Sequence, residues 1–147
     1  MVLAIALGGL SYYLVSIWPS LFPPAVFHAT AQEDCDLGRQ ACSALFEHGG
    51  RITLDIAPDR PVPMQPLRLW VGTAGLDGTS VKAQFRGVSM NMGQIDVMLR
   101  EHKPKIYTGE VVLPVSIRDS MRWRSTIMVN SSAAMHQADF EFDIHRQ

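Results

Sequence analysis

The first 32 residues of this 147-residue chain contain no Asp, Glu, Lys or Arg, because all 13 basic and all 14 acidic residues follow Gln32. The formal net charge of −1 at pH 7 leaves no excess of Lys and Arg, which excludes a basic surface for nucleic acid. The chain also lacks an internal repeat and has no room for a second domain of ordinary size. The composition therefore predicts one domain behind an apolar leader.

Local signatures of catalysis are missing as well. The sequence contains no G-x-S-x-G, H-E-x-x-H, Walker or G-x-G-x-x-G motif. The five histidines are scattered along the chain at His28, His48, His102, His136 and His145. We therefore predict that the protein is not an enzyme.

The leader, residues 1–22, is a continuous apolar run. As a helix it would be about 33 Å long, enough to cross a hydrocarbon core of about 30 Å. Tyr12, Tyr13 and Trp18 are aromatic residues of the kind found at membrane interfaces, and Pro23-Pro24 would end the helix. We predict a transmembrane anchor in contact with lipid. A signal peptide cleaved after Ala29-Thr30-Ala31 and a buried helix of a soluble protein are the alternatives.

Only two cysteines are present, Cys35 and Cys42, and they stand seven positions apart. Outside the cytoplasm the expected state of such a pair is a disulfide that closes a small loop. A thiol pair that binds metal or exchanges disulfides is the alternative. We interpret residues 23–34 as a linker and residues 35–50 as a cysteine loop.

From residue 51 onward apolar and polar residues alternate, which is typical of strands with one face in the core. The alternation predicts seven strands, separated by turn sequences, at residues 52–56, 67–71, 81–86, 95–100, 107–113, 123–129 and 140–144. Short strands in this spacing predict an all-β fold, an immunoglobulin-like antiparallel sandwich over residues 51–147. Trp123 falls on an inward position and is predicted to lie in the core.

The most unusual local sequence is Met90-Asn91-Met92-Gly93, between two predicted strands. In an extended chain residues two apart point to the same side, so Met90 and Met92 could face one ion. Thioether sulfur is a soft ligand that suits Cu(I). Met121 is the candidate third ligand, with Met64 or a histidine as further options. Packing is the competing interpretation, because methionine also fills irregular core space.

Four short sequences occur in a fixed order: Cys35-Asp36-Leu37 with Cys42, Met90-Asn91-Met92-Gly93, Leu113-Pro114-Val115 and Met121-Arg122-Trp123. In this order the chain resembles a family of small membrane-anchored periplasmic proteins of proteobacteria, similar to the YtkA/FixH-like β-sandwich group. The resemblance implies a role in copper handling and respiratory oxidase assembly. Relatives often carry a cysteine where this chain has Ser116, which implies a weaker, all-thioether site here.

These observations lead to two functional hypotheses. The first is a non-enzymatic protein, anchored in the inner membrane with its C-terminal domain in the periplasm, that assists copper delivery to a respiratory cytochrome oxidase or its assembly. Its partners would be the oxidase or its copper chaperones, and Met90, Met92 and Met121 would hold Cu(I). The second is an accessory structural subunit of a respiratory complex without a metal site, whose helix packs closely through Gly8-Gly9.

Overall fold

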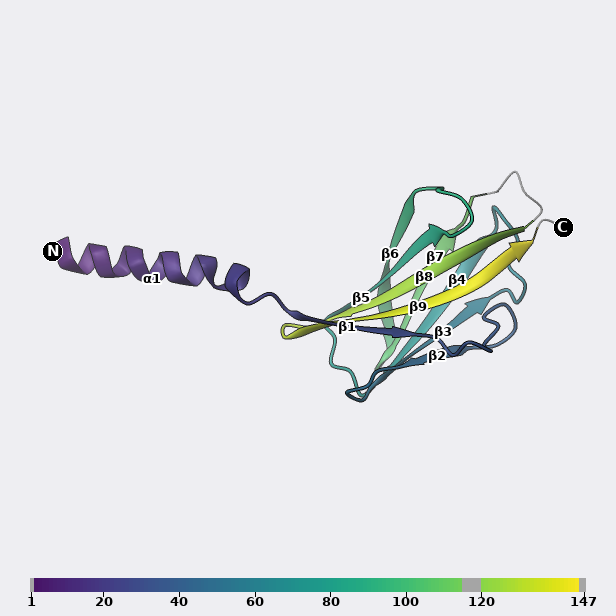
Figure 1. The fold of residues 1–147 in the computed structure, drawn as a ribbon, viewed down its shortest axis with the longest axis horizontal. Helices are drawn as coiled ribbons and strands as arrows, with labels where there is room; N and C mark the ends of the chain where they lie inside the picture. The colour runs from purple at the N-terminus through teal and green to yellow at the C-terminus, as the bar shows by residue number, and fades with distance from the viewer. Residues whose placement is uncertain (1, 115–119, 146–147) are drawn as a thin grey trace.

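The fold is a single β-barrel-like sheet with one helix projecting from it (Figure 1). The computed structural model describes residues 2–114 and 120–145. It contains one helix, α1 (Val2–Leu21), and nine strands: β1 (Ala25–Thr30), β2 (Cys42–Leu45), β3 (Arg51–Ala57), β4 (Pro66–Ala74), β5 (Ser80–Gly87), β6 (Gln94–Lys103), β7 (Ile106–Val112), β8 (Ser120–Asn130) and β9 (Ala134–His145).

The strands follow one another in the order β1-β9-β8-β5-β6-β7-β4-β3-β2. Strand β6 joins the two halves of this sheet, because residues 94–99 pair with β5 and residues 100–103 pair with β7. The two edge strands approach each other through an isolated bridge between Ala31 and Ala44. The sheet is therefore curled into a nearly closed barrel around one core.

The mostly-β prediction is confirmed, and each of the seven predicted strands is present as one of β3 to β9. The prediction of an antiparallel sandwich is wrong in two respects. Strand β1 runs parallel to β9, so the sheet is mixed, and β6 continues through both halves instead of leaving two separate sheets. The alternation within one strand shows which of its side chains face the core, but it does not show which strand is its neighbour. The alternation therefore could not predict that the sheet curls into a nearly closed barrel.

The segment interpreted as linker and cysteine loop contains the two strands that were missed. Residues 25–30 form β1 and residues 42–45 form β2. Phe27, Ala29 and Ala31 alternate toward the core and pack against it, whereas Val26 and His28 are exposed. Because Phe27, Ala29 and Ala31 follow a longer apolar leader, their alternation does not stand out as a strand in the sequence. This segment forms a strand because the edge of β9 is available for pairing.

The core consists of the inward positions of the strands, as the alternation predicts. Trp123, Phe85 and Phe140 are among its largest side chains, and Trp123 is only 1% exposed, which confirms its predicted position. One core residue, Leu37, comes from the turn between β1 and β2 and is 2% exposed. Leu37 therefore closes the barrel where no strand covers it.

Helix α1 is present where the apolar leader predicted a helix, and it projects away from the barrel (Figure 1). Large apolar side chains between Leu10 and Trp18 are exposed. Within the part of the chain that the structure describes, no helix is both long and apolar enough to cross a membrane. The helix is thus confirmed, whereas its predicted transmembrane character is not.

Candidate methionine site

The predicted methionine site lies at the end of the barrel opposite α1, in the loop of residues 88–93 that joins β5 to β6. Two hydrogen bonds shape this loop. The Val88 N–H donates to the Arg122 carbonyl at 2.9 Å, which attaches the loop to the start of β8. The Gly93 N–H donates to Asn91 Oδ1 at 3.1 Å, and Gly93 has a φ of 78°, which favours glycine. The loop is therefore held against β8 and turned back into β6.

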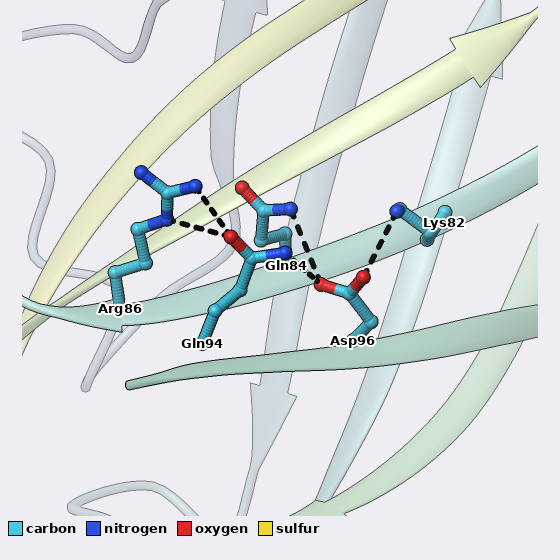
Figure 2. A network of polar contacts seen from close by, with 5 residues as sticks. All are labelled: Lys82, Gln84, Arg86, Gln94 and Asp96. Carbon is cyan, nitrogen blue, oxygen red and sulfur yellow. Dashed lines mark hydrogen bonds and ion pairs between the residues drawn. The ribbon is translucent and has the colours of Figure 1, made fainter. Parts of the chain in front are cut away.

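Polar side chains on the outer face hold the two strands that carry this loop in register (Figure 2). Asp96 accepts hydrogen bonds from Lys82 at 3.1 Å, Gln84 at 3.2 Å and Gln94 at 2.9 Å. Arg86 donates to Gln94, the residue directly after the loop. The hydrogen bonds from Lys82 and Gln94 lower the pKa of Asp96. This carboxylate therefore stays charged in mildly acidic solution, and the hydrogen bonds that it accepts persist there.

Gly87 lies beside two of the three residues that were predicted to bind the metal. A side chain at this position would collide with the methyl group of Met121 and with the carbonyl oxygen of Met90. Glycine therefore leaves room for both the Met121 methyl group and the Met90 carbonyl oxygen to approach residue 87. Met121 is 3% exposed, and Met90 and Met92 are partly buried and pack against the core. The loop and β8 thus place all three methionines on the core side of one barrel end.

The alternative third ligands lie elsewhere or point outward. Met64, in the loop between β3 and β4, is 62% exposed. His136 lies opposite Val129, at the other end of β8 from Met121. There its ring stacks on Phe27 at 5.1 Å and contacts Phe46 edge-on. The fold therefore separates His136 from the methionine loop by most of the length of β8.

The histidines and acidic residues that the structure describes do not form a second centre. Among the described residues, no group of three or more His, Cys, Asp and Glu side chains could hold a metal ion. Cys35 and Cys42 are joined by a disulfide, which confirms the predicted pairing. Cys42 is buried, and Cys35 is partly buried. Ser116 and Val115, which entered the resemblance, lie outside the described residues.

No family model, curated protein or solved structure matches this chain.

Proposed function

We propose that the protein is a non-enzymatic domain that works outside the cytoplasm and holds Cu(I) through Met90, Met92 and Met121. In this role it assists copper delivery to a respiratory cytochrome oxidase, or the assembly of the oxidase, and meets the oxidase or its copper chaperones as partners. The proposal joins the chemistry of the methionine loop to the motif resemblance described above. It does not require a catalytic group.

The observation that carries the proposal is that Met90, Met92 and Met121 lie at one end of the barrel and pack against its core. Met90 and Met92 belong to the loop of residues 88–93, and the Met121 methyl group and the Met90 carbonyl oxygen both lie close to Gly87. Thioether sulfur favours Cu(I) over zinc, calcium and magnesium. Because thioethers are neutral, binding would release no protons and would persist at acidic pH.

A location outside the cytoplasm is supported by the disulfide between Cys35 and Cys42, since such bonds persist mainly in oxidising compartments. The exposed apolar side chains of α1 support the attachment of this domain to a membrane surface or a membrane complex as part of the same proposal. Fractionation of cells tests this location: we expect the protein with the membranes and its domain open to protease from the outer side.

Competition for Cu(I) tests the copper site. The purified protein is titrated against a chromogenic Cu(I) chelator, together with a Met90→Leu/Met92→Leu variant and a Met98→Leu control. Met98 is a suitable control because it is 63% exposed on β6, outside the loop. We expect the double variant to bind Cu(I) at least about tenfold more weakly, because two soft ligands are lost.

Leucine and methionine have similar volumes, so the free energy of unfolding of the double variant should differ from that of the wild type by no more than about 1.5 kcal/mol. A loss of copper binding can then be separated from a loss of folding. Equal competition by the wild type and the double variant would show that the methionines pack the barrel end and do not bind the metal.

The second candidate function is an accessory structural subunit without a metal site. The exposed, uncharged helix α1 favours it, because large apolar groups that gather on one helix normally meet a partner or a lipid phase. Gly8 and Gly9 have open space around them, which would let another helix approach closely. Co-purification in mild detergent tests this function: recovery as a monomer free of any membrane complex argues against it.

A further inference from the structure

Strand β1 is one of the two edge strands of the sheet, and it is attached to the barrel mainly along one side. It pairs with β9 from Ala25 to Thr30. On the other side, within the described residues, the contact with β2 is an isolated bridge between Ala31 and Ala44. A strand with one paired edge can separate from a sheet at a lower free-energy cost than a strand between two neighbours. Local opening of the barrel is therefore expected to begin at β1.

A cluster of four rings holds the start of β1 against the barrel. Phe27 of β1 lies opposite His136 of β9, and the two rings stack with 5.1 Å between their centres and 24° between their planes. The turn between β2 and β3 supplies the other two rings. Phe46 lies edge-on to His136 and His48 lies edge-on to Phe27, each at 5.1 Å. The imidazole of His136 is therefore in contact with both β1 and this turn.

One nitrogen of this imidazole has no polar surroundings. The Nδ1 atom of His136 is buried and, among the described residues, has no hydrogen-bond partner. A neutral imidazole carries one N–H group, whereas the protonated ring carries an N–H on both nitrogens. Protonation would therefore place a charged donor where nothing accepts its hydrogen bond, and the loss of hydration lowers the pKa of His136. The paired position of β1 thus favours the neutral ring.

The other titratable groups that flank β1 lie on the outer face or in the exposed turn: His28 on β1, Asp139 on β9, and Glu47 and His48 between β2 and β3. His28, Glu47 and His48 are exposed, and Asp139 accepts a hydrogen bond from the Thr126 hydroxyl group. Val129, opposite His136 on β8, carries no charge. An exposed group can exchange its proton while β1 stays in place. His136, in contrast, obtains water at Nδ1 only when one of its ring contacts separates.

Strand β1 also sets the position of α1 relative to the barrel (Figure 1). The helix ends at Leu21, and residues 22–24 join it directly to Ala25 at the start of β1. Beyond β1, the disulfide to Cys42 fixes the chain at Cys35. If β1 leaves β9, residues 22–34 become the connection between the helix and the barrel. The orientation of α1 is then no longer determined by the sheet.

We propose that the contact between β1 and His136 is a pH-sensitive switch: in mildly acidic solution His136 takes up a proton, β1 separates from β9, and a flexible segment joins α1 to the barrel. Separation exposes the imidazolium to water, so both of its N–H groups obtain hydrogen-bond partners. The proton comes from the solvent and returns to it when the pH rises, so the change is reversible. The proposal is independent of copper binding, because the methionine loop lies at the other end of the barrel.

Amide hydrogen exchange of the full chain at about pH 7.5 and about pH 5 tests the proposal. Protection factors, which correct for the pH dependence of the intrinsic exchange rate, are compared for β1 and for β8, which is paired on both sides. In the open state His136 has its ordinary pKa of about 6.5, so opening becomes more favourable as the pH falls through that value. We expect protection in β1 to fall by at least about threefold relative to β8 at the lower pH. Equal changes in β1 and β8 would overturn the proposal.

Variants identify the group that is responsible. His136→Phe keeps a ring against Phe27 but cannot be protonated, so protection in β1 relative to β8 should no longer depend on pH. His136→Leu is a second variant that removes the same titration with a side chain of different shape. His28→Gln is the matched control, because it removes an exposed histidine from the outer face of β1, and it should keep the pH dependence of the wild type. A wild-type response in both His136 variants, or its loss in His28→Gln, would overturn the proposal.

Discussion

At the scale of single residues, His136 is a titratable group packed against two aromatic rings. Its ring is stacked on Phe27 and lies edge-on to Phe46, both at 5.1 Å between ring centres. Within the described residues, its buried Nδ1 atom has no hydrogen-bond partner. Loss of hydration lowers the pKa of His136 below its ordinary value. The folded protein therefore favours the neutral imidazole.

This lowered pKa makes the stability of the domain depend on pH. Below the ordinary pKa of about 6.5 the unfolded chain takes up a proton that folded His136 resists, so the free energy of unfolding falls as pH decreases. We expect His136→Phe, which keeps an aromatic ring against Phe27, to show a smaller loss between about pH 7.5 and about pH 5. Urea denaturation at both pH values measures the difference. Parallel losses in the two proteins would contradict the prediction.

At the scale of elements, the short turn between β1 and β2 acts as a covalently closed unit. The disulfide links Cys35 to Cys42 across seven positions, and the Arg39 and Gln40 N–H groups donate to the Asp36 carbonyl at 3.0 and 3.1 Å. Leu37 lies within this unit and is buried in the core. The disulfide therefore limits the motion of the loop that closes one part of the barrel.

Removal of the disulfide should lower stability without changing the fold. The disulfide restricts the unfolded chain, and for a loop of this length the loss of that restriction lowers the free energy of unfolding by about 2–3 kcal/mol. We expect Cys35→Ser/Cys42→Ala to lose about this free energy of unfolding in denaturant titrations. A thiol reductant should produce a similar loss in the wild type and none in the variant. An unchanged midpoint in both tests would show that hydrogen bonds alone hold the loop.

At the scale of the whole molecule, the barrel is completed by the segment that directly follows α1. Strand β1 covers half of β9, and Phe27, Ala29 and Ala31 pack against the core. Cleavage after Ala31, the alternative considered for the leader, would remove this strand from the sheet. Helix α1, in contrast, projects away from the barrel (Figure 1).

Two truncated chains separate the contribution of β1 to the stability of the barrel from that of α1. A chain lacking residues 1–22 keeps β1 and should unfold at nearly the same denaturant concentration as the full chain. A chain lacking residues 1–31 loses the strand pairing and exposes apolar core surface, so it should be destabilised by several kcal/mol, on the order of the whole stability of a small domain. Circular dichroism and denaturant titration measure both. Equal stability of the two truncated chains would contradict the role of β1.

Much of the fold could be predicted from alternation, because every second side chain is buried through most of β3, β4, β5 and β8. The burial of Trp123 and the pairing of Cys35 with Cys42 followed from the same local reasoning. The candidate methionine site was predicted as a set of residues. Its geometry was not, because Met121 comes to lie beside Gly87 only through the pairing of β5 with β8, in which Gly87 is opposite Trp123.

Apolar alternation was enough to predict seven of the nine strands, β3 to β9, and the faces that they bury, since a two-residue repeat needs no knowledge of distant neighbours. The folding of the whole chain, in contrast, set three further features: the segment after the leader supplies β1, β1 lies parallel to β9, and Leu37 is buried in the core. These features depend on which strands become neighbours when the sheet curls, and strand neighbours are set by the packing of the whole barrel.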